Sequence, residues 1–381
     1  MEDDLSLGYL LAVAAAGVWS PRPLTSWFAS LGDARAVVDY ARRRAGCGPA
    51  GAEPLGREAI ERIAAVDDGR ASDALAAART CEARILTKNS NDYPARLRVL
   101  CDAPLVLYCR GDTAALGART VAIVGSRSAT PYGRSVATAL CRDFARFGAT
   151  IVSGLARGID AAAHREAIQS CTPTVAVIGS GLAALYPDYH RSLAQEIVAA
   201  GGAVISEFPP ALHAQAHQFP MRNRIVAALA DATVIVEAGF KSGALITARL
   251  ADEIGRPVFA IPGDVERPTS KGTNGLIKDG VPLAESAAEI AASLEWEAAG
   301  ACDAAHGCEP GQPLLAHLDP HGSAVDELSR KTGLDAAAVS AQLTLLEISG
   351  AVRRQAGLFT AVKTQGRPNL AAHAHPPDRR R

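Results

Sequence analysis

The segment that decides the fold of this chain is 149-ATIVSGLARGIDAAAH-164, an apolar, β-branched run followed by a glycine-bearing loop and an alanine-rich stretch. This order predicts a strand, a short loop and a helix. The first backbone N–H groups of a helix lack partners within it, so they favour an anion. Ser153 adds a hydroxyl donor, Gly154 and Gly158 allow close backbone approach, and Arg157 adds a permanent charge. The segment is a candidate phosphate seat, and an ordinary strand-to-helix turn fits the same pattern.

The same strand, loop and helix unit recurs along the central part of the chain. Near-continuous apolar strands separated by helical stretches are typical of a parallel sheet that is covered on both faces. We predict an α/β fold over residues 84–295, a Rossmann-like, doubly wound and mostly parallel sheet with its ligand outside the carboxyl ends of the strands. The predicted strands are 104-PLVLYCRG-111, 120-TVAIVG-125, 149-ATIVSG-154, 174-TVAVIG-179, 202-GAVIS-206, 232-ATVIVEA-238 and 257-PVFAI-261.

Polar and charged residues gather at the predicted carboxyl edge of this sheet. They come from 125-GSRSATPYGRS-135, from 220-PMRNR-224 and from 237-EAGFKSGALIT-247, as well as from the opening segment. The arginines and the lysine would supply charge, and the glycines and hydroxyl or amide groups would supply close approach and donors. The candidate phosphate-binding residues are Ser126, Arg127, Ser153, Gly154, Arg157, Gly158, Asn223, Arg224, Lys241, Ser242 and Gly243. The aromatic residues near these loops, which are compatible with either base stacking or packing, are Tyr132, Tyr186, Phe208 and Phe240.

These loops lack the signatures of cofactor-dependent and metal-dependent enzymes. The first strand is followed by GSRSATPYG rather than G-x-G-x-x-G, and G-x-x-x-x-G-K-[ST] does not occur. Glu207, Glu237 and Asp264 follow separate strands, so we expect them to orient arginines or loop amides rather than hold metal ions. We expect His164 to partner Asp160, one helical turn earlier. The sequence therefore predicts no cofactor, no metal and no catalytic residue.

Composition places further bounds on the protein. The 381 residues are enough for more than one domain, and the formal net charge of −1 argues against a globally basic coat but allows a local basic groove. The eight cysteines contain no close pair that would indicate disulfides or a CxxC zinc module. Cys302, His306 and Cys308 form the one metal-like cluster, and its three irregularly spaced ligands do not favour a metal. The start MEDDLSL lacks a basic signal region, and no apolar run reaches the ~20 residues of a membrane span, so we expect a cytoplasmic protein.

Two smaller domains are predicted to flank the sheet. Residues 1–80 show helical periodicity, and their turn 15-AAGVWSPRP-23 carries one glycine and a bulky Trp19, which favours a scaffold over a DNA-binding hairpin. Residues 296–312 are a predicted linker, residues 313–363 a predicted winged helix and residues 364–381 a predicted disordered tail.

The predicted winged helix has few base-reading side chains. Its second helix carries Ser340, Gln342 and Thr344 but no Arg or Lys, and Arg353 and Arg354 come only in the wing. A protein contact or nonspecific DNA contact is at least as compatible with this pattern as sequence-specific binding. The predicted caps of the helices are Gly333, Asp335 and Gly350.

Taken in order, the motifs GSR…YG, SGLARGIDAAAH, FPMRNRI, VEAGFKSGALITA and IPGDVERPTSKGTNGLI closely resemble those of the DNA-processing protein A (DprA/Smf) family. This resemblance covers at least residues 84–290. It implies a cytoplasmic bacterial protein that binds and protects single-stranded DNA, forms a homodimer and loads the RecA recombinase during natural transformation, with single-strand-binding protein as a further partner. The region 273-TNGLIKDGVPL-283 resembles the dimerisation segment of the family, which implies interface roles for Asn274, Ile277, Lys278 and Leu283.

Two other function classes fit parts of the chain. Phosphoribohydrolases of related fold carry P-G-G-x-G-T-x-x-E with a catalytic glutamate, whereas in this chain Ala248 and Arg249 follow Thr247 and no acid does. A transcriptional regulator acting through residues 313–363 would need a more strongly charged recognition helix.

Overall fold

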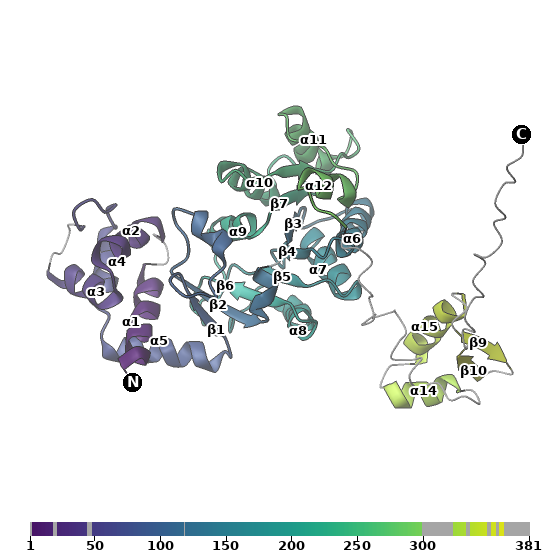
Figure 1. The fold of residues 1–381 in the computed structure, drawn as a ribbon, viewed down its shortest axis with the longest axis horizontal. Helices are drawn as coiled ribbons and strands as arrows, with labels where there is room; N and C mark the ends of the chain where they lie inside the picture. Colours follow the sequence, from purple (N-terminus) through teal and green to yellow (C-terminus); the bar gives the residue numbers. More distant parts are fainter. Residues whose placement is uncertain are drawn as a thin grey trace, which may run out of the picture. The chain divides into compact units, whose positions relative to one another are not determined.

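Eight strands form one sheet in the computed structural model (Figure 1). The structure describes residues 2–17, 21–43, 48–117, 119–298, 323–332, 336–348, 352–355 and 358–361. The strands of the sheet are β1 (Arg84–Thr87), β2 (Val106–Gly111), β3 (Thr120–Val124), β4 (Thr150–Ser153), β5 (Thr174–Val177), β6 (Ala203–Ser206), β7 (Ala232–Ile235) and β8 (Val258–Ala260).

The order of the strands is β1-β2-β6-β5-β4-β3-β7-β8. The six strands from β6 to β8 are parallel, β2 runs antiparallel to β6, and β1 runs antiparallel to β2. From β3 the chain first adds strands on one side and then returns to add β7 and β8 on the other. This confirms the predicted doubly wound sheet and places its switch point between β3 and β7, where such folds bind ligands.

Helices cover both faces of this sheet because alternate residues of each strand point to opposite sides. In β3, Ala122 and Val124 pack in one core cluster, and Val121 and Ile123 pack in another. The first cluster lies under α9 (Gln218–Leu229) and α10 (Gly243–Glu253), and the second under α6 (Pro131–Ala145), α7 (Ile159–Gln169) and α12 (Ala287–Ser293). The remaining helical segments of this part are η1 (Ala95–Val99), η2 (Thr113–Leu116), η3 (Asp188–His190), α8 (Arg191–Ala199), η4 (Pro268–Ser270) and α11 (Lys271–Lys278).

Local capping explains where the helices next to the switch point begin. The hydroxyl of Thr130 accepts a hydrogen bond from the N–H of Gly133 (3.1 Å), and Pro131 occupies the first turn of α6. At α10, the hydroxyl of Ser242 accepts from the N–H of Ala244 (3.3 Å). These caps fix the loops that precede the helices, and both loops carry candidate site residues.

The N-terminal helices pack against the sheet. They are α1 (Glu2–Ala16), α2 (Pro21–Leu31), α3 (Ala34–Arg43), α4 (Arg57–Ala64) and α5 (Asp68–Thr80). Leu11 and Leu75 are buried in the same cluster as Val106 and Tyr108 of β2, so α1 and α5 extend the hydrophobic core of the sheet. The predicted turn around Trp19 lies outside the described residues at positions 18–20.

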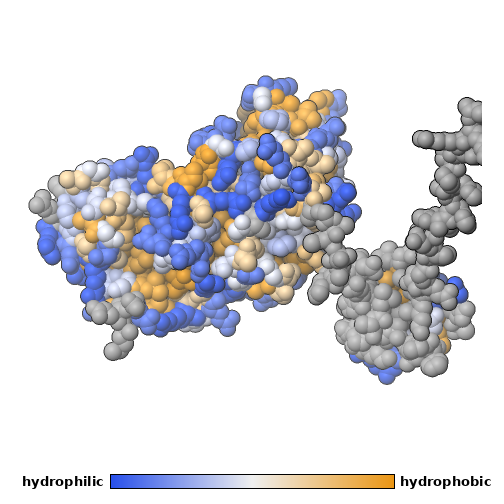
Figure 2. All heavy atoms as spheres, viewed as in Figure 1, coloured by the Kyte–Doolittle hydropathy of each residue, from blue (hydrophilic) through white to orange (hydrophobic). Residues whose placement is uncertain are grey.

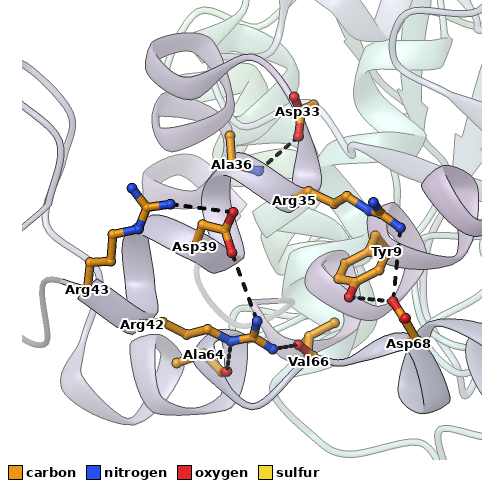
Figure 3. A network of polar contacts seen from close by, with 10 residues as sticks. All are labelled: Tyr9, Asp33, Arg35, Ala36, Asp39, Arg42, Arg43, Ala64, Val66 and Asp68. Atoms are coloured by element: carbon orange, nitrogen blue, oxygen red, sulfur yellow. Dashed lines mark hydrogen bonds and ion pairs between the residues drawn. The ribbon is translucent and has the colours of Figure 1, made fainter.

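Polar contacts link the N-terminal helices to one another (Figure 3). The hydroxyl of Tyr9 donates to Asp68 (2.8 Å), which joins α1 to α5. The guanidinium of Arg42 donates to the carbonyl oxygens of Ala64 (3.0 Å) and Val66 (2.5 Å), and so joins α3 to the C-terminal end of α4. Polar and charged side chains of these helices thus form contacts within the bundle.

The second structural unit, Ala305–Arg381, has the winged-helix arrangement. Its described elements are α14 (Val325–Thr332), α15 (Ala336–Ile348) and the antiparallel hairpin of β9 (Val352–Gln355) and β10 (Leu358–Ala361). Leu328, Val339 and Leu343 form its core with residues of the hairpin. The predicted caps Gly333, Asp335 and Gly350, and the cluster of Cys302, His306 and Cys308, lie outside the described residues.

Candidate nucleic-acid interface

The loops after β3 and β4 are locked together at the switch point. The N–H of Ile159, the first residue of α7, donates to the carbonyl oxygen of Ser126 (3.2 Å). The N–H of Ser126 donates to the carbonyl oxygen of Glu237 (2.6 Å), which joins the loop after β3 to the loop after β7. The Ser126 hydroxyl accepts from the N–H of Ser128 (3.1 Å). Three strand ends are therefore held as one rigid edge.

Gly158 makes the close approach of these two loops feasible. Its φ is +87°, and a Cβ at this position would collide with the carbonyl oxygen of Ser126 and lie 2.8 Å from that of Arg127. The predicted need for glycine is therefore met, but the backbone that comes close to it is that of the neighbouring loop.

Arg127 and Arg157 are exposed neighbours at this edge. The Nε of Arg157 donates to the carbonyl oxygen of Arg127 (3.2 Å), so the Arg157 side chain lies against the backbone that carries the Arg127 side chain. The Arg127 guanidinium carbon lies 5.3 Å from the centre of the Phe219 ring, which is the range of a cation–π contact. The structure thus brings together two permanent positive charges, one from each loop.

Aromatic rings complete a hollow beside these two arginines. It has a volume of about 270 Å³. The rings of Tyr186 and Phe219 lie 5.7 Å apart between centres, and the side chains of Tyr186 and Tyr189 are 51% and 64% exposed. Exposed aromatic faces next to arginines are the combination that holds a base and its phosphate. The residues that line this hollow are Arg127, Gly154, Ala156, Arg157, Tyr186, Pro187, Tyr189, Phe219 and Arg222.

Phe219, Tyr189 and Arg222 line this hollow and were not among the residues that the sequence predicted. Phe219 and Arg222 stand in the motif FPMRNRI, and only Asn223 and Arg224 of that motif were expected to contact a ligand. Arg222 is 4% exposed, and its Nη1 donates to the carbonyl oxygens of Gly154 (2.5 Å) and Val177. Burial lowers the pKa of Arg222 to about 10, against the opposing effect of Asp160, so it stays charged at neutral pH.

Asp160 accepts hydrogen bonds from backbone N–H groups of the loop that was expected to bind a phosphate. Its buried carboxylate accepts hydrogen bonds from the N–H groups of Gly154 (3.1 Å) and Ala156 (3.3 Å). Burial raises the pKa of Asp160, while Arg222 and these two N–H groups oppose the rise. The Gly154 N–H is therefore bound within the protein. A phosphate at this edge would be held by side-chain charge more than by loop amides.

Two of the predicted phosphate-binding side chains are wrong because they are buried. The hydroxyl of Ser153 donates to the carbonyl oxygen of Ile123 (2.6 Å) and is fully buried between β3 and β4. Arg224 forms ion pairs with Asp102 (3.0 Å) and Glu207 (2.5 Å) beneath the surface. Neither side chain can reach a ligand at the edge of the sheet.

Asn223, Ser242 and Gly243 meet at the beginning of α10. The Asn223 side chain accepts a hydrogen bond from Arg222 Nε (3.2 Å) and donates to the carbonyl oxygen of Gly243 (3.4 Å). Asn223 and Gly243 line a second, smaller hollow of about 50 Å³ that shares Arg127, Gly154, Ala156 and Arg222 with the first. Lys241 is exposed on the adjacent loop and lines neither hollow.

The acidic residues at the strand ends have the structural roles that the sequence predicted. Glu237 accepts from the N–H and hydroxyl of Thr130 (3.0 Å each), and Asp264 pairs with Arg267 (3.3 Å). His164 differs from its prediction, because its Nδ1 bonds to the hydroxyl of Thr174 (2.8 Å) rather than to Asp160. Burial lowers the pKa of His164 to about 3.

The other aromatic candidates divide between core and surface. Phe208 is fully buried, so it belongs to the core. The hydroxyl of Tyr132 donates to the carbonyl oxygen of Pro262 (2.9 Å), and Phe240 is 80% exposed on the loop that carries Lys241. Of the four rings considered from the sequence, Tyr186 alone lines the larger hollow.

The region expected to form a dimer interface is partly committed to internal contacts. The Asn274 side chain accepts from the N–H of Gly263 (3.1 Å) and donates to its carbonyl oxygen (2.8 Å). Ile277 is half-buried, Lys278 is exposed and Leu283 is 50% exposed. Figure 2 shows apolar residues at the surface of α11, next to hydrophilic ones. Leu283 is thus the exposed large apolar side chain among these four residues.

In the winged-helix unit, the exposed Thr344 has a partner within its own helix. Its hydroxyl donates to the carbonyl oxygen of Ser340 (2.9 Å), one turn earlier on α15. Arg353 is exposed on the hairpin.

None of the helices in the described parts of the chain has the length and apolar character that a membrane span requires. Those same parts contain no cluster of His, Cys, Asp and Glu suited to a metal ion.

Comparisons with known proteins agree with this geometry. Residues 84–295 match the family of DNA recombination-mediator protein A, and residues 304–357 match the DprA winged helix domain. Protein Smf of Escherichia coli is 36% identical over 289 residues, which cover 73% of this chain and 77% of that protein. DNA processing protein DprA of Bacillus subtilis is 39% identical over 217 residues, which cover 57% of this chain and 73% of that protein.

Two solved structures resemble the fold of this chain. The crystal structure of DNA processing protein A from Streptococcus pneumoniae superposes with a TM-score of 0.64 and 31% identity, over 76% of this chain and 98% of that one. The structure of DNA processing protein A from Helicobacter pylori, reported for its single-stranded DNA binding mode, has a TM-score of 0.51 and 32% identity, over 57% of this chain and 99% of that one.

Proposed function

Since the chain belongs to the DNA recombination-mediator protein A family, we propose that it binds single-stranded DNA at the hollow beside Arg127 and Arg157, protects the strand and loads a RecA-type recombinase onto it. The related Helicobacter pylori protein is described as a single-stranded DNA binder. The setting would be uptake of DNA in natural transformation and recombination, in the cytoplasm. No chemical step on the DNA is part of this proposal.

The observation that carries the proposal is the pairing of exposed arginines with exposed aromatic rings in one hollow. Arg127 and Arg157 would neutralise consecutive phosphates, and Tyr186 and Phe219 would stack against a base. Stacking on an aromatic ring contributes about 1–3 kcal/mol per base and tolerates every base, because each base has a π-face. A duplex hides its bases in the helix, so such a hollow favours a single strand.

The arrangement of the acids supports binding without catalysis. Glu237 is buried and holds the loop of Thr130, and Glu207 is paired with Arg224. Among the described residues that line the two hollows, Asp160 is the one acid, and its carboxylate is bound to loop amides. A phosphoribohydrolase would need an acid free to act on the ribose, and the position three residues after Thr247, where its motif has glutamate, holds Leu250.

Fluorescence anisotropy of a labelled oligothymidylate tests the binding site. We expect tighter binding to this strand than to a duplex of mixed sequence, and Arg127→Ala and Arg157→Ala should each weaken it. Each phosphate contact that is lost should flatten the salt slope by about 0.7. Arg57→Ala is the matched control, because it removes the same charge from an exposed position on α4. Unchanged slopes in both site variants would exclude the hollow as the binding site.

Recombinase loading needs its own assay. We expect the protein to speed the start of DNA-dependent ATP hydrolysis by a RecA-type recombinase on a strand coated with single-strand-binding protein. Arg127→Ala should lose this effect in proportion to its loss of DNA affinity. If the wild-type protein binds the strand and still leaves the lag unchanged, the loading role is excluded and DNA binding stands.

A second assay addresses catalysis directly. The protein is incubated with nucleoside monophosphates, and the release of free base is followed by chromatography. We expect no release above the rate of a buffer blank. Release that disappears in Glu237→Gln would support the phosphoribohydrolase alternative instead.

A further inference from the structure

Three consecutive side chains of α9 reach three different parts of the site. Arg222 contacts the ends of β4 and β5, Asn223 contacts the beginning of α10, and Arg224 contacts Asp102 and Glu207 on the side of the N-terminal helices. Successive residues of a helix point about 100° apart, so one short polar run can hold three neighbours. The motif 222-RNR-224 therefore connects three neighbouring segments at the carboxyl edge.

Of these three residues, Arg222 lies directly beneath the hollow. Its Nη1 donates to the carbonyl oxygens of Gly154 and Val177, and its Nε donates to Asn223. Asp160 supplies the opposing charge and holds the N–H groups of Gly154 and Ala156. The carbonyl of Gly154 is thus bound to Arg222, and its N–H to Asp160.

Gly154 has a different role from the one expected of a phosphate-binding glycine. A Cβ at this position would lie 2.6 to 2.7 Å from the guanidinium atoms of Arg222. The space beside Gly154 is therefore filled by the protein's own arginine. The glycine is needed so that Arg222 can reach the two carbonyls.

We propose that Arg222 is a positioning residue of the single-strand site, which holds the loop of Gly154 to Gly158 in place from below and does not itself contact the phosphates. This inference rests on the proposed function. The loop carries Arg157, so a shift of the loop would move one of the two exposed cations away from Arg127. The Arg222 guanidinium would therefore affect DNA binding indirectly, through the position of this loop.

The variant Arg222→Lys separates positioning from direct contact. Lysine keeps the charge, but its single nitrogen cannot replace both Nη1, which bonds the two carbonyls, and Nε, which bonds Asn223. We expect the affinity for a labelled oligothymidylate to fall roughly tenfold, because the loop that carries Arg157 loses its support, and the salt slope to flatten by at most about 0.7, the value of one phosphate contact. Arg57→Lys is the matched control, because it makes the same exchange at an exposed position on α4, and it should stay within about twofold of the wild type. Wild-type affinity in Arg222→Lys would overturn the proposal.

Asp160→Asn gives a second and independent test. It removes a negative charge beside the DNA, so charge alone predicts tighter binding. Positioning predicts weaker binding, because the amide loses the charge that balances Arg222, and its neutral oxygen is a weaker acceptor for the two loop N–H groups that share one carboxylate oxygen of Asp160. Unfolding midpoints in urea are recorded for both variants. If Arg222→Lys does not fold, Asp160→Asn decides the matter, and tighter binding in it would overturn the proposal.

A double-variant cycle completes the experiment. Gly154→Ala should weaken binding by a similar factor to Arg222→Lys, because its Cβ displaces the guanidinium. The double variant should be no more than about threefold weaker than either single variant, since both remove the same contact. Fully additive losses would overturn the proposal. If the wild-type protein itself fails to bind the strand, the proposed function fails, which is a different result.

Discussion

Removal of Arg224 should destabilise the fold rather than weaken DNA contacts. Its guanidinium bridges Asp102 and Glu207, and both Arg224 and Glu207 are buried. Arg224→Ala would leave the Glu207 carboxylate buried without its cation, and burial already raises the pKa of Glu207 while Arg224 opposes the rise. Breaking a buried ion pair by removing one partner costs about 3–5 kcal/mol of unfolding free energy.

Thermal unfolding can detect a loss of this size. For the roughly 300 residues of the first unit, the entropy of unfolding is about 0.6 kcal/mol per kelvin, so the midpoint should fall by roughly 5–8 °C. The exposed pair of Arg57 and Glu61 provides the control, and Arg57→Ala should shift the midpoint by less than about 1 °C. Replacing Arg224 and Glu207 together with Met and Leu should recover most of the loss.

The result that would refute this reasoning is equally specific. If Arg224→Ala keeps the wild-type midpoint and flattens the salt slope of single-strand binding by about 0.7, Arg224 contacts a phosphate in solution. The buried pairs with Asp102 and Glu207 would then not describe the DNA-bound protein. The Arg127→Ala variant should show the opposite of the pattern expected for Arg224→Ala, with a flattened slope and an unchanged midpoint.

Three further predictions address other residues. Gly158→Ala should abolish binding and lower the unfolding midpoint, because its Cβ meets the backbone of Ser126 and its φ is +87°; circular dichroism and anisotropy measure both. Burial lowers the pKa of His164 to about 3, whereas unfolded histidine titrates near ~6.5, so protons bind the unfolded chain first as the pH falls. Stability should therefore drop by roughly 2 kcal/mol between about pH 7 and about pH 5 in urea titrations, and by less in His164→Gln. Leu283→Arg should shift any dimer toward monomer in analytical ultracentrifugation without weakening the single-site affinity; an unchanged mass would exclude this patch.

The sequence predicted the sheet well because buried parallel strands carry a continuous apolar pattern. The runs from 120 to 125 and from 232 to 238 contain β3 and β7, and the glycine-bearing loops after them meet at the switch point. The exposed positive charges of the loops could also be predicted from the sequence, as Arg127 and Arg157 show. In such loops the polar side chain has no competing partner close in sequence, so the pattern and the structure agree.

The direction in which polar side chains point inside the core could not be predicted from the sequence. In 222-RNR-224 the three residues look alike in sequence, but the helix turns each toward a different neighbour. Their partners, such as Val177 and Asp102, are far away along the chain, so no local pattern identifies them. The same limit explains Ser153 and His164, whose hydrogen bonds go to Ile123 and Thr174 on adjacent strands.

The exposed cations of the described carboxyl edge set an upper limit on the DNA contacts that this edge makes in one protomer. Arg127 and Arg157 line the hollow and Lys241 stands on the next loop, whereas Arg222 is balanced by Asp160 and Arg224 by two acids. Two or three phosphate contacts correspond to a salt slope of about −1.4 to −2.1 for a single strand. A measured slope near −2 would mean that this edge accounts for the binding by one protomer. A slope twice as steep would require a second protomer on the same strand or a contribution from the winged helix, and Leu283→Arg would separate these two explanations, because it should halve the slope in the first case and leave it unchanged in the second.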